Sequence, residues 1–394
     1  MHISRLKLVN FRNYRGLELL LPPGVTVLQG DNAQGKTNLM EAIFMLATTK
    51  SHRASSDREL ISHDAMTEPL PFTRLGTDMV RPTGDLEVDI ILRLEGSGLS
   101  TTQAESVRPS PVVARKQVRL NGVPRRAADL IGQVHAVIFG APDIDLIAGA
   151  PALSRRYLDL VNSQIDANYL RSLQRYNRVL LQRNHLLRQI QDGQAQSSEL
   201  DFWDTELVQN GCYLVERRLR LIESIDRIAR EVHHSLTSGS ERLQVVYQPG
   251  IGERSEAGDL EQLFRRGLRR SRRREEAQGM TVIGPHRDNL QFLINGMDAG
   301  KYGSRGQQHT VALSLRLAEA TYLRNEVGDS PVLLLDDVFS ELDSYRRKCL
   351  LESVGDFQQV IISTIELDYF QPSFLSGANL LQVKHGRIEP LHAS

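Results

Sequence analysis

One segment of the chain combines glycines, a lysine and a threonine at a spacing that suits phosphate binding. It reads Gly30-Asp31-Asn32-Ala33-Gln34-Gly35-Lys36-Thr37, which fits G-x-x-x-x-G-K-[ST], and Asn38 follows it. Glycines let backbone N–H groups turn toward phosphate oxygens, and a helix that starts here adds partial positive charge. Lys36 is expected to reach the β- and γ-phosphates as a catalytic residue, and the Thr37 hydroxyl is expected to ligate Mg²⁺. Residues 30–38 therefore predict a site for ATP and Mg²⁺.

Two adjacent carboxylates follow an apolar run nearer the C-terminus. The run Val332-Leu-Leu-Leu is typical of a strand buried on both faces, and Asp336 and Asp337 stand where that strand ends. The sites of α/β sheets form at this end of their strands. We expect Asp336 to hold Mg²⁺, directly or through water, and Asp337 to polarise the attacking water as the catalytic base. The alternative is a pair of Asp side chains that cap a turn.

A second anion site is predicted where Tyr302-Gly-Ser304-Arg-Gly306-Gln307-Gln opens a helical pattern over 310–325. Ser304 suits the N-cap, and the N–H groups near Gly306 have no partners inside the helix. The chain's own P-loop already holds phosphates, so Ser304, Gly306 and Gln307 are expected to bind the γ-phosphate of a second copy. ATP is then expected to join two chains head to tail as a homodimer. An ordinary capped helix is the alternative.

These motifs stand in the order found in a known superfamily. The S-x-G-Q segment resembles the signature of ABC-type ATPases, and Ser340-Glu-Leu-Asp343 resembles their D-loop. Most of these proteins carry Glu where this chain has Asp337, so hydrolysis is expected to be slow. Where many of them carry a switch His, this chain has Thr364. A hydroxyl can donate one hydrogen bond, and the identity of the γ-phosphate sensor stays open.

The elements that must position these residues follow an α/β order. Strand patterns over 3–9 and 25–29 precede the phosphate segment, and helical spacing follows it over 38–48. A further strand pattern covers 290–294. We expect an α/β fold of the ABC-type ATPase head, with a P-loop lobe that has a mixed β-sheet and a helical second lobe that has a short antiparallel helical arm. The expected parts are the start of the ATPase lobe, the helical lobe, and the rest of the ATPase lobe with the signature, at 1–150, 151–285 and 286–394.

The arm is predicted between Arg155 and Leu236, where two long helical patterns flank a polar loop over 192–198. Apolar residues in the two helices repeat every three or four positions, and this heptad-like spacing predicts an antiparallel hairpin. These residues are Tyr169, Leu173, Tyr176, Leu180 and Leu187 in the first helix, and Leu221, Ile225, Ile228 and Val232 in the second. Roughly 30 residues at 1.5 Å per residue give an arm of about 45 Å.

Composition excludes several classes of protein. The 394 residues contain 48 Lys plus Arg and 48 Asp plus Glu, so any affinity for nucleic acid must come from a local basic patch. Cys212 and Cys349 show no CxxC spacing, and neither a disulfide framework nor a zinc site is expected. The lack of a signal-peptide pattern and of a long apolar stretch predicts a cytoplasmic protein without a membrane partner. Residues 96–111 are rich in Gly, Ser, Thr and Pro, and we assign them no chemistry.

Two arginine-rich stretches are candidates for such a basic patch. Arg171, Arg175 and Arg178 fall on one face of the first arm helix. Residues 265–274 contain seven Arg, but two Glu follow directly. Either stretch suits contact with phosphates, and a solvated helix face is the alternative for both.

Three segments extend the resemblance to one family in particular. The segments Leu8-Val-Asn10-Phe11-Arg12-Asn13-Tyr14, Ser154-Arg-Arg-Tyr-Leu-Asp159 and Gly284-Pro-His-Arg-Asp288 resemble the RecF family of recombination mediators. The triplet His286-Arg287-Asp288 also matches a kinase catalytic loop, but no D-F-G segment follows it, so we reject that interpretation. We expect these residues to brace the lobe interface or to contact DNA. In Phe139-Gly-Ala-Pro-Asp143 the chain departs from relatives, which usually show P-E-D.

The resemblance implies a function in DNA repair, recombination and replication-fork maintenance. It implies a slow, DNA-stimulated ATPase that dimerises with ATP on double-stranded DNA beside single-stranded gaps and is released by hydrolysis. With RecO and RecR, such a protein helps to load recombinase on single-stranded DNA. A short SMC-like tether between DNA segments is the structural alternative, and the short arm disfavours it. A transporter subunit is a second alternative, and the arm between the P-loop and the signature opposes it.

Overall fold

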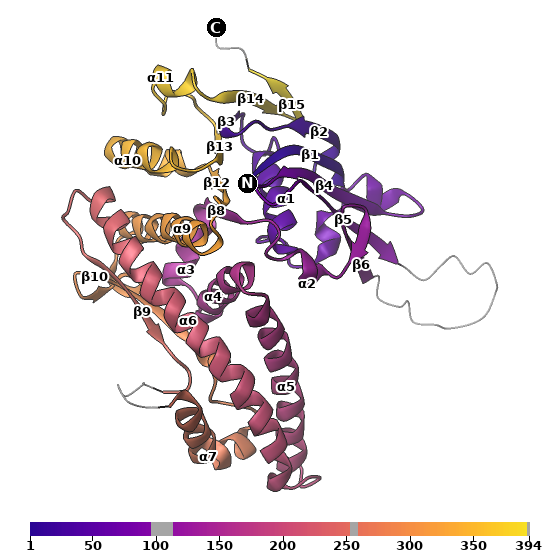
Figure 1. The fold of residues 1–394 in the computed structure, drawn as a ribbon, viewed down its shortest axis with the longest axis vertical. Coiled ribbons are helices and arrows are strands. Elements are labelled where there is room, and N and C mark those ends of the chain that lie inside the picture. The colour runs from indigo at the N-terminus through magenta and orange to yellow at the C-terminus, as the bar shows by residue number, and fades with distance from the viewer. Residues whose placement is uncertain (96–112, 253–258, 392–394) are drawn as a thin grey trace. The chain divides into compact units, whose positions relative to one another are not determined.

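The computed structural model describes residues 1–95, 113–252 and 259–391 of the chain (Figure 1). The polar stretch over 96–111 lies outside the described residues. Helices and strands alternate along the chain in the way the motifs require, and the predicted α/β class is confirmed. Among the described helices, none has the length and the apolar content needed to cross a membrane.

The contacts divide the chain into two compact units. One comprises Met1–Ala141 with Leu323–Ser394, and the other comprises Pro142–Tyr322. The predicted boundaries differ from this division, because residues 142–150 and 286–322 group with the helical unit. The signature segment therefore belongs to the helical unit, whereas we expected it in the ATPase lobe.

The first unit contains two six-stranded sheets. One sheet has the order β2-β1-β4-β5-β6-β7, and the other has the order β15-β14-β3-β13-β12-β8. The first is antiparallel, and the second is parallel except at the β14–β15 pair, so the predicted mixed sheet is confirmed. The strands are β1 His2–Phe11, β2 Tyr14–Leu20, β3 Gly24–Gln29, β4 Phe72–Val80, β5 Leu86–Glu95, β6 Val113–Leu120, β7 Val123–Arg125, β8 Ala136–Gly140, β12 Val332–Asp336, β13 Gln359–Thr364, β14 Asn379–Lys384 and β15 Arg387–Pro390.

Helix α1 (Lys36–Thr48) follows the phosphate segment and contacts strands of both sheets. Leu39, Ile43 and Leu46 are fully buried, and the helix is buried along almost its whole length. A helix that is covered on all sides is a rigid base for its own N-terminus. The unit also contains α2 Ala127–Leu130, α10 Ser344–Val354 and α11 Pro372–Leu375, with short 3₁₀ turns at η1 Asp57–Leu60, η2 Ala65–Thr67 and η6 Val338–Glu341.

The second unit is mainly helical and has a small antiparallel sheet of order β11-β10-β9. The described elements that begin in it are α3 Ile144–Ala148, α4 Pro151–Ile165, α5 Ala167–Gln191, η4 Ser197–Glu199, α6 Leu200–Leu236, β9 Leu243–Gln248, α7 Leu260–Gln278, η5 Pro285–Arg287, β10 Asn289–Ile294, β11 Met297–Asp298, α8 Ala299–Tyr302 and α9 Arg305–Val327. The turn η3 (Ala141–Asp143) joins the two units in sequence. Figure 1 shows α5 and α6 side by side, and α7 beside them.

Helices α5 and α6 form the predicted antiparallel hairpin. Arg218 of α6 contacts Tyr169 near the start of α5, and Arg183, further along α5, contacts Asp204 near the start of α6. The prediction of a single long first helix was wrong, because α4 ends at Ile165 and the side chain of Asp166 caps α5. With 25 residues α5 is about 37 Å long, so the arm is shorter than expected.

The predicted seam is correct in the first helix and wrong in the second. Tyr169 and Tyr176 of α5 are buried in one core cluster with four residues of α6, Leu207, Val208, Leu214 and Val215. The stretch with Ile225 lies beyond the start of α5 and contacts β9, where Asp226 accepts a hydrogen bond from the backbone N–H of Val245 at 2.7 Å. Apolar periodicity continues along all of α6, but its partner changes.

A third helix, α7, packs along the hairpin. Phe264 and Leu268 enter the core shared by α5 and α6, and Glu275 pairs with Arg183 at 2.7 Å with both side chains fully buried. The sequence reasoning did not assign these residues a packing role, because seven arginines mask the two apolar anchors. The arm is therefore a packed group of three helices.

Candidate nucleotide-binding site

The phosphate segment lies between β3 and α1, as predicted, and close packing fixes its two glycines. A Cβ on Gly30 would lie 2.4 Å from the carbonyl oxygen of Val383 in β14. Gly35 has φ 123°, and a Cβ there would lie 2.7 Å from Nδ2 of Asn13. Only glycine fits both positions, and glycines in such a turn let the backbone approach phosphate oxygens closely.

The N-terminal segment over 8–14, which resembles the RecF family, contacts this loop through Asn13 and Tyr14. Nδ2 of Asn13 donates to the carbonyl of Gln34 at 2.9 Å, and Asn38 donates to Oδ1 of Asn13 at 2.9 Å. The Tyr14 hydroxyl donates to the carbonyl of Gly35 at 3.0 Å. At the other side of the loop, Oε1 of Gln34 accepts the backbone N–H of His385 at 2.7 Å. The resembling segment over 8–14 therefore has a positioning role that its sequence did not reveal.

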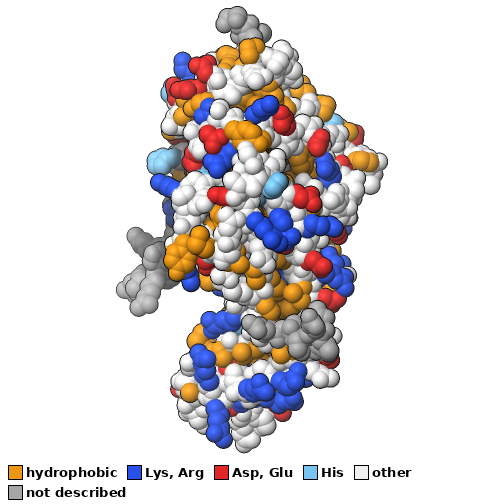
Figure 2. Space-filling view, turned by 90° about the vertical axis from the view of Figure 1, so that its left-hand side faces the viewer, with side chains coloured by type: hydrophobic (Ala, Val, Ile, Leu, Met, Phe, Trp, Pro, Cys, Tyr) orange, Lys and Arg blue, Asp and Glu red, His pale blue; other side chains and the backbone are white. Residues whose placement is uncertain are grey.

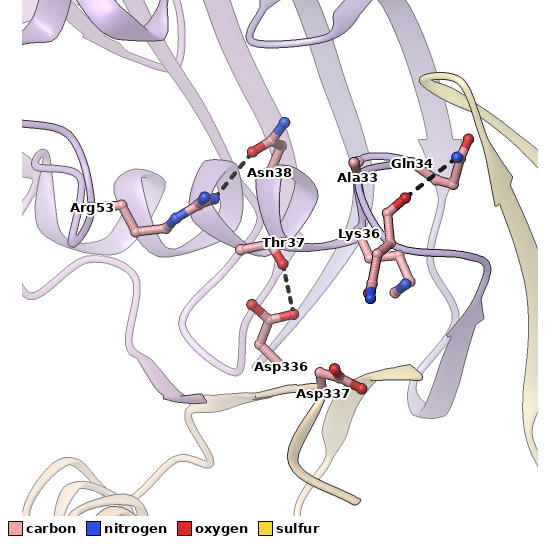
Figure 3. Close-up of a pocket in the computed structure, with 10 residues that line it drawn as sticks. Ala33, Gln34, Lys36, Thr37, Asn38, Arg53, Asp336 and Asp337 are labelled. Atoms are coloured by element: carbon pink, nitrogen blue, oxygen red, sulfur yellow. Dashed lines mark hydrogen bonds between the residues drawn. The ribbon is translucent and has the colours of Figure 1, made fainter. Parts of the chain in front are cut away.

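Lys36 is buried and points into the cavity beneath the loop (Figure 3). Its ammonium donates to the carbonyl of Asp31 at 2.8 Å and to the carbonyl of Gly30. Burial lowers the pKa of Lys36, while the carboxylates of Asp337, Asp336 and Asp31 oppose this shift. The cation is thus positioned among anionic and carbonyl oxygens at the start of α1.

Thr37 and Asp336, the two residues predicted to ligate Mg²⁺, lie side by side. The Thr37 hydroxyl lies 3.1 Å from Oδ1 of Asp336 (Figure 3). Ser363 at the end of β13 donates to the same carboxylate oxygen at 2.7 Å and accepts the N–H of Asp337 at 2.9 Å. Sequence reasoning missed Ser363, because only the parallel pairing of β12 and β13 brings it beside the Asp pair.

This oxygen pair fits Mg²⁺. Among the described residues, no group of three or more His, Cys, Asp and Glu side chains could enclose a metal ion. One carboxylate and one hydroxyl suit a magnesium ion, because it usually takes its other ligands from water and substrate phosphates. Cys212 and Cys349 are not joined in a disulfide bond.

Asp337 has the environment of a base. Its backbone is left-handed, with φ 54°, and its Oδ1 is buried without a hydrogen-bond partner among the described residues. Burial raises the pKa of this carboxyl, Asp336 and Glu341 add to the shift, and Lys36 opposes it. This carboxylate oxygen, which lies beside Thr37 and Asp336, is able to accept a hydrogen bond from a water molecule.

These side chains line one cavity of 330 Å³. Its lining residues are Asn32, Ala33, Gln34, Gly35, Lys36, Thr37, Asn38, Arg53, Asp336 and Asp337. Arg53 was not predicted; it follows α1 and donates to Oδ1 of Asn38 at 3.1 Å (Figure 3). Thr364 is buried at the end of β13, and its hydroxyl donates to the carbonyl of Glu366 at 2.8 Å.

The signature segment lies in the helical unit and has the predicted cap. Oγ of Ser304 accepts the N–H of Gln307 at 3.2 Å, and Oε1 of Gln307 accepts the N–H of Ser304 at 2.9 Å. Nε2 of Gln307 donates to Glu241 at 2.8 Å. Gly306 is exposed, and a Cβ there would meet nothing within 4 Å. The start of α9 is therefore rigid, exposed and open to an anion.

The other two segments that resemble the RecF family, over 154–159 and 284–288, meet inside the helical unit. Arg218 is buried and pairs with Asp159 and Asp288, each at a distance typical of a strong ion pair, 2.6 and 2.5 Å. His286 accepts a hydrogen bond from the Tyr176 hydroxyl at 2.6 Å. The expectation that these residues brace the lobe interface or contact DNA was wrong for His286 and Asp288, because their side chains brace the interior of this unit. For Arg287, which is exposed, it stays a prediction.

Comparisons with known proteins agree with the motifs. A family model described as the RecF/RecN/SMC N terminal domain matches residues 2–387. The DNA replication and repair protein RecF of Herpetosiphon aurantiacus is 42% identical over 402 residues, which cover 99% of this chain and 100% of that protein. The protein of the same name from Chloroflexus aurantiacus is 40% identical, with 98% of this chain and 99% of that protein covered.

A solved structure shows the same fold. It is that of the recombination mediator protein RecF-ATP in the RecFOR pathway, with 29% identity and a TM-score of 0.83 over 99% of this chain and 98% of that chain. The predicted ABC-type ATPase head and the RecF resemblance are therefore confirmed. This chain belongs to the RecF family, within the larger RecF/RecN/SMC family.

Proposed function

We propose that this chain is a slow, DNA-stimulated ATPase that closes as a homodimer on DNA when it binds ATP and opens after hydrolysis. The observation that carries the proposal is the presence, in one chain, of a phosphate site at the start of α1 and a second, exposed helix start at Ser304, where α9 begins. A chain whose own P-loop supplies one γ-phosphate site has use for the second only with another copy.

The nucleoside part of ATP is assigned to a second cavity of 770 Å³ in the first unit, which contains the P-loop and is called the P-loop unit below. Asn38 and Arg53 line both this cavity and the phosphate cavity, so a single ligand can extend from one into the other. Ile61 and Met66 supply apolar surface for a base, and Ser62 and Asp64 supply polar groups for a ribose or an exocyclic amine.

The proposed mechanism gives each residue of the site one role. Lys36 and the loop N–H groups bind the β- and γ-phosphates, and Asp337 orients the attacking water. Thr37 and Asp336 would hold a Mg²⁺ ion, which would neutralise charge on the phosphates, and Ser363 orients Asp336. Because Asp337 is one methylene shorter than the usual Glu, slow hydrolysis is expected. The rate of hydrolysis then sets how long the dimer stays closed.

The biological role is proposed from the family. We infer binding at double-stranded DNA beside single-stranded gaps, cooperation with RecO and RecR in loading recombinase, and a cytoplasmic location. A tether between distant DNA segments is disfavoured, because α5 spans only 25 residues and α7 packs along it.

An experiment with gapped duplex DNA tests the proposal. The purified protein should retard this DNA with ATP and not without nucleotide, and Lys36→Met should abolish the ATP effect because the cation opposite the phosphates is lost. Folding of the variant is checked by circular dichroism. Equal retardation of the DNA by wild type with and without ATP would contradict the proposed ATP-driven grip.

A further inference from the structure

The outer face of α7 carries cations that pair with no acidic side chain in the described part of the chain. Five of its arginines are exposed, namely Arg266, Arg269, Arg270, Arg273 and Arg274. Among the described residues, no ion pair joins any of these five to a carboxylate, whereas Arg265 pairs with Glu261 and Arg272 with Asp204. Figure 2 shows Lys and Arg side chains gathered over the lower part of the molecule, on the side where α7 lies in Figure 1. We call these five residues the α7 arginine face.

The acidic residues that follow in sequence do not neutralise this face. Glu275 is fully buried and accepts hydrogen bonds from Arg183 and from the backbone N–H of Val282. Glu276 accepts a hydrogen bond from the Ser197 hydroxyl. Glu275 is therefore unavailable to this face. Glu276 keeps its charge but, among the described residues, forms no ion pair with any of the five arginines, so direct pairing does not balance the arginine run.

Spacing along the helix makes the face unfavourable without a partner. Arg266 and Arg270 stand four positions apart, as do Arg269 and Arg273, so like charges are neighbours on the helix surface. Such pairs destabilise a helix, and a polyanion relieves their repulsion. The helix persists because its inner face is anchored by Phe264 and Leu268.

The same anchoring makes the face rigid. Arg272 donates to Asp204 at 2.6 Å and to the carbonyl of Ser197 at 2.9 Å, which ties α7 to the start of α6. Arg183 of α5 shares Asp204 at 2.8 Å. A row of guanidinium groups on a fixed helix presents planar donors that match phosphate oxygens.

The dimensions of the face fit a nucleic-acid backbone. Residues 266–274 rise about 12 Å along the helix axis. One strand of duplex DNA presents a phosphate about every 3.4 Å along its axis, so about three phosphates fall within this length. The α5 stripe fits less well, because Arg175 is already paired with Glu206 at 2.8 Å.

We propose that the α7 arginine face is the surface through which this chain contacts the sugar–phosphate backbone of duplex DNA. The inference rests on the proposed DNA-binding function and assigns that function to one helix. Since guanidinium–phosphate contacts are independent of base sequence, the face contributes affinity and salt dependence without selecting a site.

The test is the salt dependence of duplex binding in the presence of ATP. In Arg269→Gln/Arg270→Gln/Arg273→Gln, the slope of log K against log salt should fall by about 2.7, because each phosphate contact contributes about 0.9. Between 50 and 200 mM salt, the affinity of wild type should then drop about 40-fold more than that of the variant.

The matched control removes the same charge elsewhere. Arg115, Arg126 and Arg220 are each at least 62% exposed and each pair with a carboxylate, so their triple Gln variant should keep the slope of wild type. Circular dichroism checks that all variants are folded. Arg171→Gln/Arg175→Gln/Arg178→Gln is expected to behave like the control.

The outcomes separate this inference from the proposed function. A wild type that binds duplex DNA with the same slope as the α7 variant would overturn the inference and leave the DNA-binding function intact, as would a slope that falls only in the α5 variant. If the α7 variant lost binding to poly-glutamate but kept the affinity and slope of wild type for duplex DNA, the face would be assigned to an acidic protein and the inference would also be overturned. A wild type that binds no DNA with ATP would instead defeat the proposed function.

Discussion

Acidification should destabilise the helical unit at one buried imidazole, that of His286. Its Nε2 lies 3.1 Å from the carbonyl of Thr281, which can only accept, so Nε2 carries the hydrogen. Nδ1 then accepts from the Tyr176 hydroxyl at 2.6 Å, and the ring is neutral. Burial lowers the pKa of His286 from 6.5 to about 4, and the nearby Arg287 and Arg155 add to this shift.

The size of the effect follows from that shift. Because the pKa is lower in the folded chain, the unfolded chain takes up the proton first as the pH falls. The stabilisation is complete above pH 6.5 and is lost progressively as the pH drops toward about 4. One pKa unit is worth about 1.4 kcal/mol, so His286 should cost the helical unit about 3 kcal/mol between neutral pH and pH 4.

Urea unfolding followed through Trp203 measures this loss. Trp203 is the single tryptophan of the chain and packs against the core of the same unit, so its fluorescence reports on that unit. His286→Gln cannot titrate, and the stability advantage of wild type over this variant should therefore shrink by about 3 kcal/mol from pH 7 to pH 4. An advantage that stays constant over this range would refute the assignment of a neutral, buried imidazole.

Three substitutions in the P-loop unit test the site. Asp337→Asn should keep ATP binding but block hydrolysis and accumulate ATP-bound dimers, and a variant that stays monomeric by light scattering while wild type dimerises would remove Asp337 from the role of base. Ser363→Ala should raise the Mg²⁺ concentration needed for ATP hydrolysis about 10- to 100-fold, since it removes the group that orients Asp336; an unchanged Mg²⁺ titration would argue against that role. Asn13→Ala should weaken ATP binding about tenfold by calorimetry, because two hydrogen bonds to the loop and to Asn38 are lost at about 0.5–1.5 kcal/mol each, and unchanged affinity would show that the loop holds itself.

The parts of the site that depend on local chain geometry could be predicted from the sequence. The glycine turn of the P-loop and the Asp pair at the end of β12 each lie within a few residues of the element that positions them. Ser363 could not be predicted, because strand pairing brings it from 27 residues beyond Asp336. Asn13 lies 21 residues before its partner Gln34, and an asparagine after a strand carries no signal of such a contact.

The helical unit shows a different limit. Periodicity predicted the antiparallel pairing of α5 and α6 correctly, but it missed the break at Asp166 and does not state which neighbour an apolar stripe meets. The stripe with Ile225 meets β9. Helix α7 escaped a packing assignment because its anchors, Phe264 and Leu268, are few among charged residues. The sequence placed Glu275 on a solvated helix face, whereas the structure shows it buried in an ion pair with Arg183.

An ATP-closed dimer requires that α9 presents its start to the nucleotide of a second copy. Ser304→Arg places a bulky side chain at this exposed cap and leaves every residue of the P-loop unchanged. Analytical ultracentrifugation with ATP is the direct measurement, with ATP affinity of the monomer measured alongside. We predict near-normal ATP affinity, no ATP-driven dimer and almost no hydrolysis for Ser304→Arg. If this variant dimerises with ATP as wild type does, the signature does not act between chains, and the account of an ATP-closed dimer is contradicted.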